Sequence, residues 1–248
     1  MPTANGLTGL RGVVGVLVVT GAATAVIGVQ AEEAGSGLLD AALAKAADHK
    51  GDGYAFTRHL VVRGNDEHVD IVQRYDPSAP VDSRWTLVSI DGTAPDEGGD
   101  GNTEVDSEED GDLPSYDNLA ELDTAGAELV EQDAQRAVFR LNTAASFILD
   151  EESKEFADNL VTDVTVAKTG LAAPYVSSLR IHAPAAFKPA MVAEITALET
   201  VLSYAPEPAT GRLLPRELAV DLTGSALLWI DFDVKTHIAF TDYSFVGQ

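Results

Sequence analysis

The last third of the chain, residues 174–245, constrains the fold most, because it reads as a series of β-strands separated by turns. Apolar and polar residues alternate in segments 216–222 and 237–245, and turn-forming residues lie between such segments. Segments joined by short turns pair as antiparallel neighbours, whereas a parallel sheet requires long crossover connections. The stretch therefore predicts a curved antiparallel sheet, and it carries no recognisable catalytic motif.

Further strand patterns lie upstream of this region and within it. The spacing in residues 191–204 also suits a helix, but its β-branched residues favour a strand. The remaining expected strands cover residues 54–63, 69–75, 84–90, 138–142, 145–150, 156–167, 175–183 and 226–234.

Two segments have the apolar spacing of helices. Residues 38–50 place Leu38, Ala42 and Ala46 on one face, and residues 116–131 carry an apolar stripe that begins at Leu119. Both segments are expected to cover one face of the sheet. We therefore predict an α+β fold: an incomplete antiparallel β-barrel, formed by a curved meander sheet and covered by two or so helices.

The chain is strongly acidic, because 40 Asp and Glu residues stand against 16 Lys and Arg residues and give a formal net charge of −24. Nucleic acid is excluded as an expected partner, since its binding depends on basic residues that neutralise phosphates. Residues 91–112 hold ten of the acidic residues and a single branched apolar residue. A segment covering residues 91–115 is therefore expected to be a disordered acidic insertion.

This insertion also contains the beginning of a calcium-loop pattern. Asp106, Glu108 and Asp110 place carboxylates at alternate positions, and a glycine follows at the sixth position. The ninth position is Pro114, and the twelfth is Asp117 where the pattern requires Glu. A solvated acidic loop explains the segment better, so no metal site is predicted.

The N-terminus has the pattern of an export signal. Arg11 precedes an uncharged apolar stretch, residues 12–31, which ends in the cleavage-site pattern Val-Gln-Ala. Residues 1–31 are therefore predicted to be a signal peptide, with an uncleaved N-terminal anchor as the alternative. The protein is expected to be periplasmic or secreted, and anchored to the inner membrane if the segment is not cleaved.

Groups that carry catalysis or bind metals form no recognisable motif. The chain has no cysteine, which excludes disulfides, thiol catalysis and lipidation of a lipobox cysteine. None of its five histidines forms a helical zinc motif, although His59 and His68 could meet across a hairpin. A hydrolytic site would require His182 or His237 to meet a carboxylate and a serine. We expect no catalysis, no cofactor and no metal.

Aromatic residues on the predicted strands are the remaining functional signal. They are either ordinary core residues or, as a set, the lining of the concave side of an open barrel, where they would contact an apolar ligand. The candidate lining residues are Phe56, Trp85, Phe139, Phe147, Phe156, Tyr175, Trp229, Phe232 and Phe240.

Short motifs near the C-terminus resemble the closing strands of LolA-like proteins, the periplasmic lipoprotein-carrier superfamily. They are the Pro-x-x-Gly-x-x-x-Pro turn at 208–215, Leu-Thr-Gly at 222–224 and Thr-Asp-Tyr at 241–243. Residues 75–78 and 84–87 resemble a motif of uncharacterised, proteobacterial members. The resemblance implies one domain over residues 36–248, an incomplete barrel whose helices form a lid over an apolar cavity. The acidic insertion and the charge depart from the dedicated carrier.

The resemblance and the apolar pattern together suggest an extracytoplasmic binding or carrier protein that holds an acylated or lipidic ligand in an apolar cavity. A lipid or an acylated protein is the expected partner. One alternative is a cell-envelope interaction or scaffold protein, which would use the curved sheet to bind other envelope proteins. The other alternative is a hydrolase with a cryptic site.

Overall fold

The computed structural model describes residues 37–48, 53–65, 67–95, 114–148, 156–190, 193–227 and 230–247. The predicted signal peptide and residues 96–113 of the predicted acidic insertion lie outside these ranges. In the described part of the chain, no helix is long and apolar enough to cross a bilayer.

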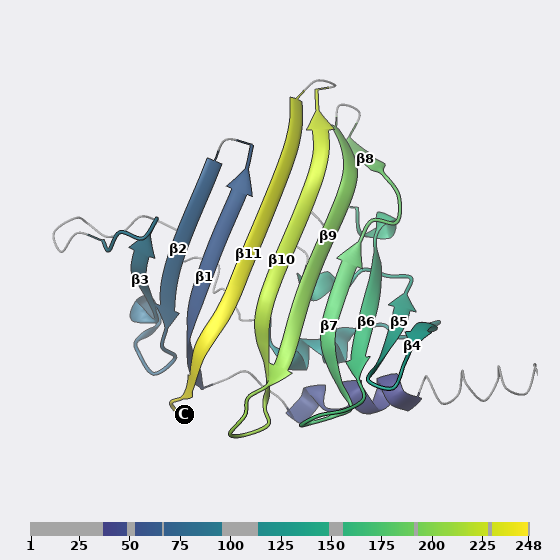
Figure 1. Cartoon of the computed structure of the whole chain (residues 1–248), viewed down its shortest axis with the longest axis horizontal. Helices are drawn as coiled ribbons and strands as arrows, with labels where there is room; N and C mark the ends of the chain where they lie inside the picture. The colour runs from purple at the N-terminus through teal and green to yellow at the C-terminus, as the bar shows by residue number, and fades with distance from the viewer. Residues whose placement is uncertain are drawn as a thin grey trace, which may run out of the picture.

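One antiparallel sheet dominates the structure, with eleven strands in the described residues (Figure 1). The strands are β1 (Tyr54–Gly64), β2 (Glu67–Tyr75), β3 (Trp85–Ile90), β4 (Glu128–Gln132), β5 (Arg136–Leu141), β6 (Val161–Ala167), β7 (Tyr175–His182), β8 (Phe187–Ala190), β9 (Ala193–Pro206), β10 (Leu213–Ala226) and β11 (Ile230–Phe245). Ten strands follow the order β3-β2-β1-β11-β10-β9-β7-β6-β5-β4, and β8 pairs with β9. The prediction of a curved antiparallel sheet is confirmed.

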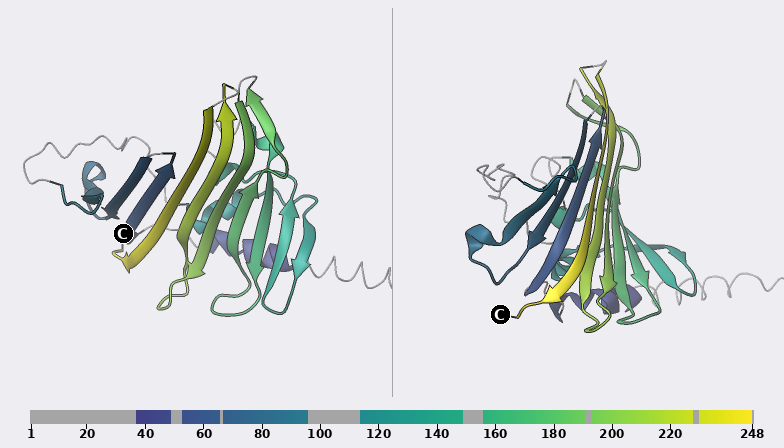
Figure 2. Two further views of the ribbon diagram at one scale, coloured as in Figure 1. Left: turned by 45° about the horizontal axis from the view of Figure 1, so that its top comes forward. Right: turned by 60° about the vertical axis from the view of Figure 1, so that its left-hand side comes forward.

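The first and last strands of the described chain, β1 and β11, pair with each other inside the sheet. Bulges increase the twist of a sheet, and one in β10 between Pro215 and Glu217 also accommodates a proline that an unbroken ladder would exclude. Figure 2 shows the resulting twist, which carries β3 and β2 away from β4 and β5. The sheet is open, with β3 and β4 as its two edges in the described chain.

Helical structure is scarcer than predicted. The first predicted helix is present as an α-helix over residues 37–43, followed by the 3₁₀ turn η1 (Ala46–Asp48). The second, over 116–131, is wrong: only the 3₁₀ segment η3 (Tyr116–Glu121) forms, and Glu128–Gln132 is the edge strand β4. Gly126 has a positive φ of 74°, which a helix cannot contain, so the chain turns there.

Several strand boundaries also differ from the prediction. Residues 145–150 were expected to be a strand, but the described part forms the 3₁₀ turn η4 (Ser146–Ile148). Another 3₁₀ turn, η5 (Ala157–Asn159), precedes β6, and a third, η2 (Val81–Ser83), precedes β3. Strand β11 is continuous where two strands were expected. The choice of a strand over a helix for 191–204 is confirmed by β9.

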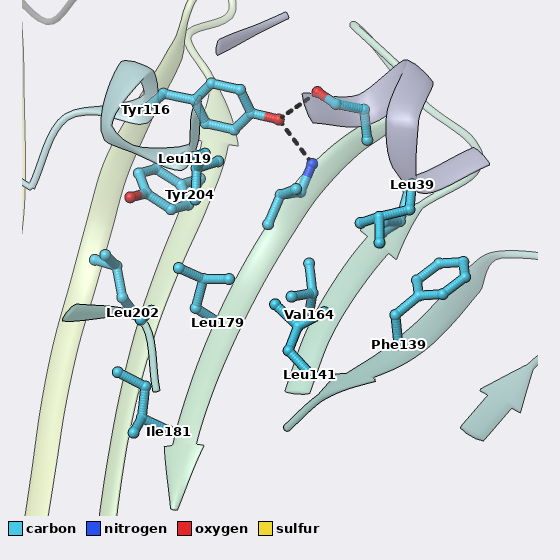
Figure 3. Close-up of a cluster of buried hydrophobic side chains, with 14 of the residues drawn as sticks. Leu39, Tyr116, Leu119, Phe139, Leu141, Val164, Leu179, Ile181, Leu202 and Tyr204 are labelled. Carbon is cyan, nitrogen blue, oxygen red and sulfur yellow. Dashed lines mark hydrogen bonds between the residues drawn. The ribbon is translucent and has the colours of Figure 1, made fainter. Parts of the chain in front are cut away.

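The α-helix over residues 37–43 and the 3₁₀ segments η1 and η3, together called the helical segments, lie over β5, β6, β7 and β9. They close a hydrophobic core there (Figure 3). The Tyr116 hydroxyl joins the two layers, because it donates to the Ala42 carbonyl at 3.3 Å and accepts from the Val176 N–H at 2.8 Å. Burial raises the pKa of Tyr116, so this hydroxyl keeps its proton. The core therefore occupies one half of the sheet.

Candidate ligand-binding face

Register alone defines a continuous apolar row across the sheet. Directly paired residues point to the same face of a sheet, so the pairings can be followed from strand to strand. Starting at β3 and ending at β4, the successive partners are Ile90, Ile71, Leu60, Ile238, Leu218, Leu202, Leu179, Val164, Phe139 and Leu129. Every strand of the ten-strand path thus contributes an apolar side chain to one row on one face.

The neighbouring row on the same face continues this character. Its members are apolar residues and threonines, namely Val69, Val62, Thr236, Val220, Thr200, Ile181, Thr162 and Leu141. Beyond it, Val234 pairs with Leu222, and Leu222 pairs with Leu198. These rows of the face therefore carry only apolar residues and threonines.

Burial along this face differs between the two halves of the sheet, and Leu218 and Leu222 on β10, at the boundary, still pack against the buried core. Leu202, Leu179 and Val164 are fully buried beneath the helical segments. On β2, β1, β11 and β10 the corresponding side chains are only partly buried, and Val69 is 36% exposed. We call this second region the open apolar face; it consists of Leu60, Val62, Val69, Ile71, Leu218, Val220, Leu222, Val234 and Ile238.

The opposite face of the same strands is polar. His59 contacts Asp70 at 2.9 Å, and His237 contacts Glu217 at 2.7 Å, in each case across adjacent strands. Arg180 pairs with Glu199 between β7 and β9. This asymmetry shows that the alternation in the strands separates a charged, hydrated face from an apolar one.

A buried carboxylate organises the polar face near β6. Asp163 accepts two hydrogen bonds from Arg140, at 2.8 and 3.0 Å, and its side chain is 9% exposed. His182 Nε2 lies 3.2 Å from the same carboxylate. Burial raises the pKa of Asp163, but the hydrogen bond and charge of Arg140, followed by those of His182, outweigh it and hold that pKa below its usual value.

An aromatic cluster closes one end of the open apolar face. Phe56 is 3% exposed, and its ring centroid lies 5.1 Å from that of Tyr75, 5.6 Å from Trp85 and 5.9 Å from Phe240. Tyr243 joins the cluster at 5.7 Å from Phe56. Three predicted lining residues, Phe56, Trp85 and Phe240, are thus brought together.

The other predicted lining residues are dispersed. Phe139 lies in the closed core, and Phe147, Phe156 and Tyr175 pack against that core from its margin. Phe232 lies on the apolar face opposite Gly224, where a Cβ on the glycine would collide with its ring. Trp229 lies outside the described residues.

The open apolar face is mainly aliphatic, so the aromatic candidates do not define it. The signal that locates it is the period-two pattern of β10, where Leu218, Val220 and Leu222 alternate with Ala219 and Asp221. On β1 the pattern is weaker, because Val61 lies between Leu60 and Val62. The pairing of β1 with β11, which unites these strands, has no signature in local sequence.

The histidines do not assemble the sites considered from sequence. His59 is opposite Val72 and His68 is opposite Arg63, so the two histidines lie in separate rows of the hairpin. Within the described residues, no cluster of three His, Asp or Glu side chains could hold a metal. His182 and His237 each meet a carboxylate, but no serine hydroxyl in the described chain hydrogen-bonds to either ring.

Comparison with protein-family models, with curated proteins and with solved structures gives no match for this chain. The class of this protein is therefore described by its fold alone. It is an open antiparallel sheet with one apolar face, and half of the width of that face is covered.

Proposed function

We propose that this protein is an extracytoplasmic binding or carrier protein that holds an acyl chain against the open apolar face. The observation that carries the proposal is the apolar row, which is buried at Leu202 and Leu179 and remains partly exposed at Ile238 and Leu60. In this proposal the sheet is an incomplete β-barrel, the helical segments cover its closed half, and the ligand covers its open half.

The dimensions of the face suit an acyl chain. A strand rises about 3.3 Å per residue, so the apolar stretch of β10 from Leu218 to Ala226 extends over roughly 26 Å. The hydrocarbon core of a bilayer, two acyl chains thick, measures about 30 Å, so one chain requires roughly 15 Å. An acyl chain lying parallel to the strands therefore fits on the face with room to spare.

The hydrophobic effect supplies enough free energy for such binding. Removal of one methylene from water contributes about 0.8 kcal/mol, so ten methylenes contribute roughly 8 kcal/mol before the cost of immobilising the ligand. Part of the ligand would still face solvent, which lowers this value. Affinity in the micromolar range needs about 8 kcal/mol in total, so binding depends on burying most of the chain.

The location outside the cytoplasm rests on the export-signal pattern in residues 1–31. The resemblance of the C-terminal motifs to LolA-like proteins supports the same assignment, since those proteins are periplasmic carriers. An acylated protein or a free lipid would present the same chemistry to the apolar face.

Two adjacent residues of β11 provide a matched test. Ile238 lies at the centre of the apolar row, and Ala239 lies on the opposite face, between His59 and Glu217. We expect Ile238→Gln to reduce uptake of a fluorescent fatty acid at least tenfold and Ala239→Gln to leave it unchanged. Melting curves of both variants separate loss of binding from loss of folding.

Native mass spectrometry of the purified protein provides an independent measurement. The proposal predicts bound species with the masses of lipids or fatty acids. A protein that carries no lipid and takes up no fatty acid at micromolar concentration contradicts it.

A further inference from the structure

One charged side chain interrupts the apolar face. Arg58 lies on β1 two residues from both Phe56 and Leu60, so its side chain points to the same side of the sheet as theirs. Its direct partners on the neighbouring strands are Gln73 and Phe240. Its Cζ lies 4.2 Å from the centroid of the Trp85 ring. Its Nε and Nη2 donate to Gln73 Oε1 at 3.1 and 2.5 Å.

The charge of Arg58 is not neutralised by the groups around it. Trp85 and Gln73 are uncharged, and within the described residues no carboxylate forms an ion pair with Arg58. Arg136, Arg140 and Arg180, by contrast, each contact a carboxylate. Burial lowers the pKa of Arg58, but an arginine still keeps its proton at any physiological pH.

This arrangement is unfavourable for the protein alone. A partly buried cation without a counter-ion loses hydration that a neutral amide and a ring replace incompletely. The chain has 40 acidic residues and 16 basic ones, so counter-ions are abundant elsewhere on it. An anion that reached Arg58 from the open apolar face would provide the missing partner, and the planar guanidinium suits the oxygens of a carboxylate or a phosphate.

We propose that Arg58 binds the anionic head group of a single-chain amphiphile whose tail lies on the open apolar face. This inference rests on the proposed function and specifies its ligand class. The ligand is thereby an alkyl carboxylate or an alkyl phosphate, with the head group at the aromatic cluster.

The surroundings of Arg58 set the direction of the tail. Phe56 and its aromatic neighbours fill the space on one side, as the 3% exposure of Phe56 shows. On the other side Leu60 and Val62 continue the apolar face toward Gly64, which is six residues from Arg58 and therefore about 20 Å away. A tail of roughly 15 Å fits along this path.

The decisive experiment compares four sixteen-carbon probes on the intact protein at pH 8 by displacement of a neutral fluorescent alkyl probe. The probes are hexadecanoate, hexadecyl phosphate, hexadecanol and hexadecylamine. We expect at least one of the anions to bind about tenfold more tightly than hexadecanol, and the amine to show no such gain. A net charge of −24 on its own would produce the reverse order, because it repels anions and attracts the amine.

Two variants locate the effect. In Arg58→Gln we expect the preferred anion to lose about tenfold in affinity while hexadecanol is unchanged. Arg63→Gln serves as the matched control, because Arg63 is exposed on the same strand and points to the polar face, and it should change neither affinity. If Arg58→Gln does not fold, the comparison of the four probes on the wild-type protein still tests the proposal.

The outcomes distinguish this inference from the function on which it rests. Equal affinity for hexadecanol and both anions in the wild type overturns the role of Arg58 and leaves acyl-chain binding intact. Failure of all four probes to bind overturns both. If only one anion binds tightly, the comparison identifies a carboxylate or a phosphate as the head group.

Discussion

At the scale of single residues, Gly224 shows how closely the strands pack. A Cβ at this position would collide with the Glu194 carbonyl oxygen and with the Phe232 ring. We therefore expect Gly224→Ala to lower the free energy of unfolding by about 1–3 kcal/mol, measured by urea denaturation. The control is Gly37→Ala in the helical segment, where a Cβ meets no atom and should be neutral or slightly stabilising. Equal effects of the two substitutions would contradict the close packing.

A second prediction at this scale concerns Asp163. Because its pKa is depressed in the folded protein, its ionised form stabilises the fold above the unfolded-state pKa of about 3.9. That stability is lost as the pH falls through the lower, folded-state pKa. We expect Asp163→Asn to cost about 2 kcal/mol at pH 7, since Arg140 then loses its carboxylate, and to cost progressively less below pH 4.

The measurement for Asp163 is the difference in unfolding free energy between the two proteins as a function of pH. The control is Asp221→Asn, which alters an exposed carboxylate on β10 and should leave stability nearly unchanged at pH 7. A difference for Asp163→Asn that stays constant down to pH 2 would show that the carboxylate charge is not what stabilises the fold.

At the scale of elements, the division of the sheet into a covered and an open half has a measurable consequence. Leu119 on η3 is fully buried against the core, whereas Leu60 on β1 is only partly buried. We expect Leu119→Ala to destabilise the protein by about 2–5 kcal/mol, and Leu60→Ala by about 1 kcal/mol. Thermal unfolding of the ligand-free protein tests this, and similar losses for the two variants would mean that β1 is covered as well as the core is.

The elements also show how far sequence reasoning reaches. Alternation predicts β1, β2 and β3 as strands, although the two faces are not cleanly separated: Arg58 lies on the apolar face of β1, and Val61 lies on its polar face. It failed for β4, because the adjacent Leu129 and Val130 suit a helical stripe as well as an edge strand. The prediction of a strand at the 3₁₀ turn Ser146–Ile148 is wrong for the same reason, because a short apolar run has no clear period.

The candidate site depends on contacts that local sequence does not encode. Leu60 and Ile238 are 178 positions apart in the sequence and become neighbours only through the pairing of β1 with β11. The environment of Arg58 likewise requires Trp85 and Gln73 from two further strands. The apolar character of each strand was therefore predictable, but the single face on which the strands combine was not.

At the scale of the whole molecule, the charge and the apolar face have separate roles. The polar face and the acidic surplus keep the protein hydrated, while the apolar row crosses the sheet from β3 to β4. Covering half of this row with helical segments stabilises the fold. Leaving the other half partly exposed costs stability, and under the proposed function a bound acyl chain would restore it.

The most direct test of the central claim is to observe which methyl groups touch a bound acyl chain. In a protein with labelled methyl groups, nuclear Overhauser effects from the methylenes of a saturating sixteen-carbon ligand should reach Leu60, Leu218 and Ile238 on the open apolar face. Leu179 and Val164 in the closed core should show none. Contacts at the core methyls instead, or saturation without contacts to the open apolar face, would contradict the account.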